Sequence, residues 1–148
     1  MSDAAAYALL FGSSFLAATL VPGSSEATLA ALVVSRPEET WVLLAIAIVG
    51  NTLGSAVNWM LGRWFAEFGS RRWFPASRNA LQAAVAKFAR FGSWLLLFAW
   101  VPVIGDPITV AAGVLRVDFR LFIVLVAVGK AARYLVVLWG AQLLVAYF

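Results

Sequence analysis

The chain contains neither cysteine nor histidine among its 148 residues. A disulfide framework, a zinc site, a haem ligand and a Cys or His nucleophile are therefore excluded. A Ser-His-Asp triad is excluded for the same reason. We expect no cofactor and no metal site, and the sequence favours a protein that is not an enzyme, with one alternative given below.

Charged residues are also scarce. They make up 12% of the chain, against 64% hydrophobic residues, whereas soluble domains carry roughly 25% charged residues. This composition predicts an all-α integral membrane protein with a single membrane domain over residues 1–148. The start of the chain lacks the basic region of a signal peptide, so we expect its first apolar stretch to belong to the mature protein. The net charge of +4 falls mainly between apolar segments, so it reports membrane topology, and we expect no nucleic-acid partner.

Four apolar segments lie at about residues 4–34, 41–61, 92–115 and 121–148. A helix needs about 20 apolar residues to cross the hydrocarbon core, and the second and fourth segments fit simple spans. The first and third are each interrupted by a proline that is followed four residues later by an acid. Proline breaks a helix, and a carboxylate is costly in hydrocarbon. The two copies of the pattern are Pro22-Gly-Ser-Ser-Glu26 and Pro102-Val-Ile-Gly-Asp106.

Each interrupted segment is predicted to form two helical pieces of roughly 10 residues joined by a break, which is a re-entrant hairpin. In the first, Ser24 or Ser25 is expected to cap the second piece. In the third, Asp106 is expected at the N-cap and Pro107 at the first helical position. The predicted hairpin-break residues are Pro22, Gly23, Pro102, Gly105 and Pro107.

Hairpin and span occur twice in the same order. Glu26 precedes Gly50 by 24 residues, and Asp106 precedes Gly129 by 23. This pattern predicts an inverted repeat, as in many membrane transporters. Its parts are repeat 1 at about 8–66, an amphipathic linker at 67–91 and repeat 2 at about 92–148.

The linker contains apolar residues at helical spacing over 78–91, which is typical of an interfacial amphipathic helix or of a surface helix packed on the bundle. The linker region is basic, and the connector after the third segment carries Arg116 and Arg120. If both hairpins turn back, the two basic regions share one side of the membrane. The positive-inside rule then places loop 63–91 in the cytoplasm.

Four ionisable residues lie inside the apolar segments. Since a charge at the centre of a membrane helix costs about 2.5–3.5 kcal/mol, we expect them in one polar cluster. Asn51, Ser55 and Asn58 share a helix face, and both Asn side chains are expected to satisfy leftover hydrogen bonds there. In the alternatives, the acids only cap helices, Lys130 extends to the interface and the Asn residues only join helices. The candidate binding residues are Glu26, Asp106, Lys130, Arg133, Asn51 and Asn58.

Two helix N-termini are expected to meet at this cluster, and helix N-termini attract anions. Arg133 adds a fork-shaped donor suited to phosphate. We predict the phosphate of a membrane lipid as the ligand, and an acid near a lysine can also carry a proton. A structural or assembly protein with internal ion pairs is one alternative. A membrane enzyme with Glu26 and Asp106 as an acid–base dyad is the other.

The motifs resemble a known family. The run from Leu20 to Glu26 and the run from Gly50 to Arg63 resemble the DedA superfamily, also called the SNARE-associated or VTT-domain family. The runs 100–113 and 129–134 resemble its YqaA-like branch, and the resemblance extends over about residues 11–142. It implies a multi-pass protein of the bacterial inner membrane with two facing re-entrant hairpins. It also implies a flippase or scramblase of a phospholipid or polyprenyl phosphate, linked in bacterial relatives to the proton motive force.

Within that resemblance, Glu26 matches the acid after the first Pro-Gly turn, and Asp106 and Arg133 match the YqaA-like pattern. The chain departs from the main branch at four places. Ala99 and Gly105 stand where that branch has arginines, Asn51 replaces an acid, and Trp59 replaces a tyrosine. A homo-oligomer is left open.

Overall fold

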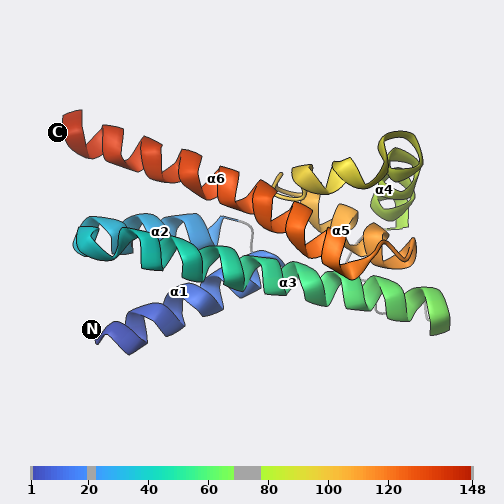
Figure 1. The fold of residues 1–148 in the computed structure, drawn as a ribbon, viewed down its shortest axis with the longest axis horizontal. Helices are drawn as coiled ribbons and strands as arrows, with labels where there is room; N and C mark the ends of the chain where they lie inside the picture. Colours follow the sequence, from blue (N-terminus) through green and yellow to red (C-terminus); the bar gives the residue numbers. More distant parts are fainter. Residues whose placement is uncertain (1, 20–22, 69–77, 148) are drawn as a thin grey trace.

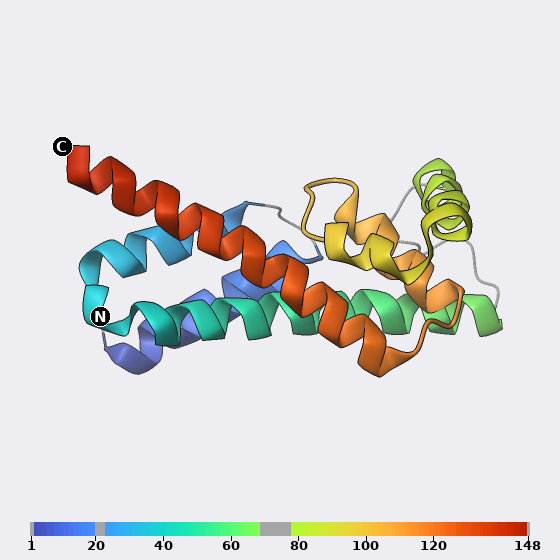
Figure 2. The same cartoon turned by 45° about the horizontal axis from the view of Figure 1, so that its top comes forward.

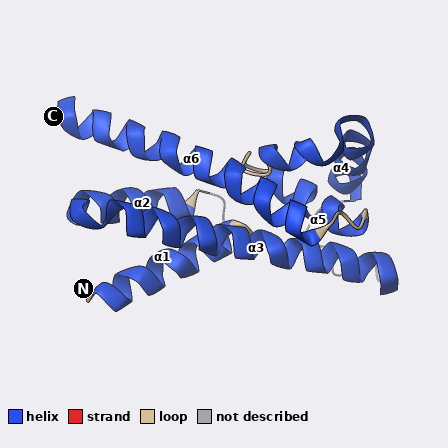
Figure 3. Cartoon of the chain, viewed as in Figure 1, coloured by secondary structure: helices blue, strands red, loops and turns tan. Residues whose placement is uncertain are grey.

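The computed structural model describes residues 2–19, 23–68 and 78–147, and over these ranges it contains helices and no strand (Figure 3). The prediction of an all-α chain is therefore confirmed. Pro22 and most of the linker before residue 78 lie outside the described residues. The elements are α1 (Asp3–Ala17), α2 (Ser24–Ser35), η1 (Pro37–Glu39), α3 (Thr40–Phe68), α4 (Arg78–Phe91), η3 (Gly92–Phe98), α5 (Gly105–Val114) and α6 (Phe119–Tyr147).

The two predicted spans are confirmed as long helices. Both α3 and α6 have 29 residues, or about 43 Å at 1.5 Å per residue. The stretches Pro37–Ala66 and Phe119–Leu144 are long and apolar enough to cross a membrane. They run in opposite directions (Figure 1) and cross near the middle of the molecule in the turned view of Figure 2. The outer face of α6 exposes large apolar side chains such as Val136, Trp139 and Leu143, and an apolar surface of this extent marks a membrane or partner contact.

The first apolar segment folds back on itself. Its first half, α1, runs into the middle of the molecule, and α2 returns to the end at which α1 begins (Figures 1 and 2). The two ends are joined there, because Arg36 after α2 pairs with Asp3 of α1 at 2.5 Å. Tyr7 of α1 donates a hydrogen bond to Glu39 at 3.0 Å.

The third segment folds back from the opposite end, so that its turn lies near the end of α1 and the start of α2 (Figure 2). Its first half, η3, is a 3-10 helix of seven residues in place of the expected α-helical piece of roughly ten. A 3-10 helix rises about 2.0 Å per residue, so seven residues cover about 14 Å. The shorter element therefore reaches almost as far as the expected one.

Both turns place the residue after the proline in the left-handed region. Gly23 has φ of 93° and Val103 has φ of 69°. The N–H of Ile104 donates to the carbonyl of Pro102 at 2.8 Å, which closes a γ-turn of the rare, strained positive-φ kind around Val103. A β-branched residue at positive φ is a genuine outlier. Strain of this sort tends to gather at functional sites.

The predicted caps are wrong by one or two residues. Gly23 is the N-cap of α2, so Ser24 and Ser25 lie within the first turn and do not cap it. Ile104 is the N-cap of α5 and Asp106 is its second residue, which places Pro107 third. The cause is the tight turn after Pro102, which allows helical backbone to begin earlier than the Asp-Pro pair indicates.

Small residues allow the helices to approach closely. A methyl group at Gly54 would overlap the carbonyl oxygen of Phe15, which fixes α1 against α3. Similarly, a methyl group at Gly113 would overlap the carbonyl oxygen of Trp59, which fixes α5 against α3.

Two apolar clusters flank a polar centre. One lies around Leu10, Leu29 and Leu43, and the other contains Phe88 and Phe122. Helix α4 packs its apolar face into the second cluster and is seen nearly end-on in Figure 1, across the long axis of the molecule. The buried polar and charged residues are Ser14, Ser25, Asn51, Thr52, Ser55, Asn58, Thr109 and Lys130.

Candidate functional site

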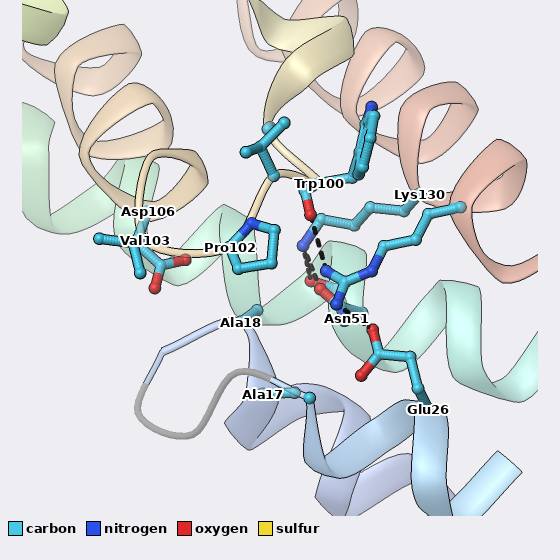
Figure 4. A pocket seen from close by; sticks show the side chains of 13 residues that line it. Ala17, Ala18, Glu26, Asn51, Trp100, Pro102, Val103, Asp106 and Lys130 are labelled. Atoms are coloured by element: carbon cyan, nitrogen blue, oxygen red, sulfur yellow. Dashed lines mark hydrogen bonds and ion pairs between the residues drawn. The ribbon is translucent and has the colours of Figure 1, made fainter. Parts of the chain in front are cut away.

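Arg133 of α6 connects the turns of both broken segments. Its Nη2 lies 2.5 Å from Oε1 of Glu26, in the first turn of α2. Its Nη1 donates to the carbonyl oxygen of Trp100, in the second turn, at 2.7 Å. The side chains of Arg133 and Glu26 are only 20% and 15% exposed, so the ion pair is largely shielded (Figure 4).

Lys130 is buried between α6 and α3, with 4% of its surface exposed. Its ammonium group donates to the backbone oxygen of Asn51 at 3.1 Å, to the side-chain oxygen of Asn51, and to Ser55 Oγ at 2.6 Å. These three acceptors match the three donors of an ammonium group, and all are neutral. The alternative in which Lys130 extends to the interface is therefore excluded. Within the described ranges, no carboxylate forms an ion pair with it.

A chain of hydrogen bonds continues from Asn51. Its Nδ2 donates to the hydroxyl of Tyr134 at 2.8 Å, and that hydroxyl donates to Ser25 Oγ at 2.9 Å. Tyr134 and Ser25 are almost completely buried. Tyr134 was not among the predicted site residues, although it lies four residues after Lys130 and therefore on the same helix face.

Asn58 does not reach the ionisable residues. Its Nδ2 donates to the carbonyl of Ala18 at 2.9 Å and to Thr109 Oγ1 at 3.2 Å. Asn58 lies seven residues beyond Asn51, or about 10 Å along α3, which brings it to α5 instead of to the ion pair. The expectation that it satisfies the ionic cluster is wrong, and it joins the end of α1 to α5.

Asp106 lines a small polar cavity together with Glu26, Lys130 and Arg133. Its carboxylate has no hydrogen bond to any residue that the structure describes, and Glu26 Oε2 is buried and likewise lacks a described partner. The cavity measures about 20 Å³, which holds roughly one water molecule. Asn51, Gly23 and Pro102 also line it, so five of the six candidate binding residues meet here with both turns.

Gly105 and Pro107, which were predicted at the break, lie buried at the start of α5. Gly105 is held against η3, because a methyl group there would overlap the carbonyl of Ala99. Among the residues that are described, no group of three or more acids is arranged to hold a metal ion.

The two acids occupy different surroundings. Glu26 is bound by Arg133, whereas the carboxylate of Asp106 lies on the other side of Pro102 in Figure 4. Each stands in the first turn of a short helix, α2 or α5, where the helix dipole favours negative charge. The site therefore combines one largely shielded guanidinium, one buried ammonium and two helix N-termini around a cavity that holds roughly one water molecule.

Two long apolar helices and a buried ionic centre between two broken helices define a helical membrane protein. A family model of the VTT domain matches residues 21–142, and the chain belongs to this family, which confirms the resemblance to the DedA superfamily. The inner membrane protein YqaA of Escherichia coli K12 is 39% identical over 137 residues, which cover 93% of this chain and 92% of that protein.

The YqaA protein of Shigella flexneri is also 39% identical over 137 residues, with the same coverage of 93% and 92%. An uncharacterised protein of Haemophilus influenzae is 34% identical over 137 residues, which cover 88% of this chain and 83% of that protein. No solved structure matches the chain significantly.

Proposed function

We propose that the chain is a transporter of the bacterial inner membrane that moves a phosphate-bearing lipid between leaflets, as a flippase or scramblase. The observation that carries this proposal is the position of Arg133. Its guanidinium pairs with Glu26 at the start of α2 and with the carbonyl of Trp100 in the second turn, so it stands between the two broken segments. Family membership and the name of the Escherichia coli relative support the location.

In this proposal the two broken segments are re-entrant hairpins of an inverted repeat. Equivalent packing in the two halves supports the repeat. A methyl group at Gly50 would lie 2.8 Å from the carbonyl oxygen of Phe11 in α1, and one at Gly129 would lie 2.5 Å from that of Leu97 in η3. Each hairpin thus packs its first helix on its own long helix at a matching glycine. Gly62 and Gly140 lie at similar distances after these glycines, 12 and 11 residues further along the chain. They depart from the symmetry, because Gly62 packs on α5 while Gly140 faces open space.

The distribution of charge supports one orientation in the membrane. The end of α3, helix α4 and the start of α6 lie at the same end of the molecule (Figure 1). The indole N–H of Trp59 donates to the carbonyl of Val117 at 3.2 Å, which joins the second half of α3 to the connector between α5 and α6 that carries Arg116. Both basic regions therefore share an end, and the positive-inside rule assigns that end, with loop 63–91, to the cytoplasm.

Transport in this account is an exchange of anions on Arg133. A lipid phosphate displaces Glu26 and binds the guanidinium of Arg133, which can donate two parallel hydrogen bonds to it. The displaced carboxylate is then left without its guanidinium partner. Coupling to a proton gradient is part of this proposal because the resemblance to bacterial relatives implies it.

The alternative of a structural protein rests on the same ion pair, since it also clamps α6 to α2. Exchanging the charges, with Glu26→Arg and Arg133→Glu together, distinguishes the structural role from the transport role. A clamp tolerates the exchange, so a double variant that folds and restores the cellular phenotype would support the structural role, whereas one that folds but moves no lipid would support the transport site. The enzyme alternative has less support, because the structure places no hydrogen bond between the described carboxylates of Glu26 and Asp106.

Reconstituted vesicles test the proposal. With fluorescent phospholipids of several headgroups, wild-type protein is expected to move at least one lipid faster than protein-free vesicles do. Arg133→Ala is expected to abolish the difference while the protein still inserts. Arg120→Ala, at an exposed position on α6, serves as the matched control and should transport normally. Wild-type rates equal to those of empty vesicles for every lipid, including a polyprenyl phosphate, would sink the proposal.

A further inference from the structure

An apolar groove lies directly beside the ion pair. It has a volume of about 360 Å³ and is lined by Trp100, Pro102, Ala132, Arg133, Val136 and Val137. One wall is a face of α6 and the other is the turn between η3 and α5. Trp100, Pro102 and Arg133 also line the polar cavity, so the groove and the cavity share a wall with the guanidinium at their boundary.

The sizes of the two spaces decide how a lipid can approach. The polar cavity, about 20 Å³, holds roughly one water and is too small for a phosphate group. The groove is far larger and is almost entirely apolar apart from Arg133. An anionic lipid therefore reaches Arg133 from the groove side, with hydrocarbon in the groove and phosphate at its polar end.

Arg133 has donors left for such a ligand. A guanidinium group has five N–H donors, and the structure assigns two of its nitrogens to one acceptor each, Glu26 and the Trp100 carbonyl. A phosphate oxygen can bind to a remaining N–H before Glu26 is displaced. The groove is therefore suited to a first encounter that leaves the ion pair in place.

A second groove on the same helix provides an internal comparison. It lies between the end of α2 and the end of α6, measures about 400 Å³ and is lined by residues that include Val33, Val34 and Ala141. Its lining contains no charged side chain. Size and apolarity are thus shared by both grooves, and the guanidinium is what distinguishes the first.

We propose that the groove at Ala132, Val136 and Val137 is a binding site for one hydrocarbon chain of an anionic phospholipid whose phosphate is bound by Arg133. This inference rests on the proposed function and adds the route by which the lipid enters, sideways from the bilayer between α6 and the second turn. The small lining residue Ala132 leaves the groove open, and a larger side chain at that position fills it.

Photocrosslinking tests the site without relying on transport. The probe is phosphatidylglycerol with a diazirine on one acyl chain, in vesicles that contain the wild-type protein. Crosslinks at Val136 and Val137 are expected to exceed those at Val33 and Val34 about tenfold, the ratio supplied by a charge-assisted hydrogen bond of ordinary strength. Diacylglycerol with the same label lacks the phosphate and should give equal crosslinking in the two grooves. Equal crosslinking by the charged probe would overturn the inference.

A matched pair of alanines extends the test to transport. Ala132→Phe fills the first groove and is expected to lose the crosslinks and slow transport about tenfold, whereas Ala141→Phe fills the second groove and should do neither. Normal transport in the Ala132→Phe variant would contradict the groove while leaving the transporter proposal intact. If wild-type protein moves no lipid at all, the proposed function fails, and the crosslinking ratio still decides whether the groove binds lipid. The same ratio decides if Ala132→Phe does not fold.

Discussion

Lys130 is a buried cation, and its partners among the described residues are neutral oxygens of α3. A charge in hydrocarbon surroundings is tolerated when every donor is satisfied, and removing its partners leaves the full desolvation cost. The side chain of Asn51 supplies one of the oxygens and also binds Tyr134. The stability of the polar centre therefore depends on Lys130 and Asn51 as a unit, more than on either residue alone.

A double-mutant cycle tests this coupling. Asn51→Leu leaves the ammonium group short of one acceptor and is expected to cost about 1.5–3 kcal/mol, the usual contribution of a hydrogen bond to a charged group. Adding Lys130→Met removes the stranded charge, so the double variant should recover much of that loss. The measurement is the free energy of unfolding in detergent micelles, followed by tryptophan fluorescence.

Asn58→Leu is the control, because Asn58 shares no hydrogen bond with Lys130. Its effect should add to that of Lys130→Met within about 0.5 kcal/mol. If the Asn51 and Lys130 substitutions prove equally additive, the polar centre does not act as a unit.

Among the elements, α3 is the common support for both hairpins. Its glycines contact α1 at Phe15 and α5 near Val110, in each case at a backbone carbonyl. Contacts of this kind fix the distance and the register between helices, because a backbone atom cannot rotate away as a side chain can. The position of Arg133 relative to Glu26 follows from that register, since the two residues are more than a hundred positions apart in the sequence.

Gly113 gives the sharpest test of this role. Gly113→Ala places a methyl group against the carbonyl of Trp59 and is expected to lower stability by about 1–3 kcal/mol, the usual cost of overpacking. Gly140→Ala places the same group in open space on α6 and should raise stability by up to about 1 kcal/mol through helix propensity. Thermal unfolding monitored by size-exclusion chromatography measures both, and equal effects of the two substitutions would refute the packing argument.

For the molecule as a whole, the large features could be predicted because they depend on composition along the chain. The spans follow from uninterrupted apolar stretches, and the breaks follow from Pro22 and from Pro102 with its nearby acid. The ionisable residues are expected to lie in one cluster, because an isolated charge inside the membrane is costly. None of these features depends on how one helix is rotated against another.

The details of the centre could not be predicted, because they depend on that rotation. Lys130 and Arg133 share a helix face, so the sequence cannot tell which of them pairs with an acid. In the structure Arg133 forms an ion pair with Glu26, and neutral oxygens surround Lys130. The strained turn at Val103 is equally hidden, since a β-branched residue gives no local signal for a positive φ.

Cysteine accessibility tests the central claim that both broken segments turn back within the membrane, and the natural chain has no cysteine to remove. Single cysteines would be placed at the exposed positions Ser2, Glu38, Gln82 and Arg120 and labelled with a membrane-impermeant maleimide in vesicles of both orientations. The account predicts that the cysteines at 82 and 120 react from the cytoplasmic side and those at 2 and 38 from the opposite side. Reaction of 82 and 120 from opposite sides, or of 2 and 38 from opposite sides, would mean that a broken segment crosses the membrane and would contradict the account.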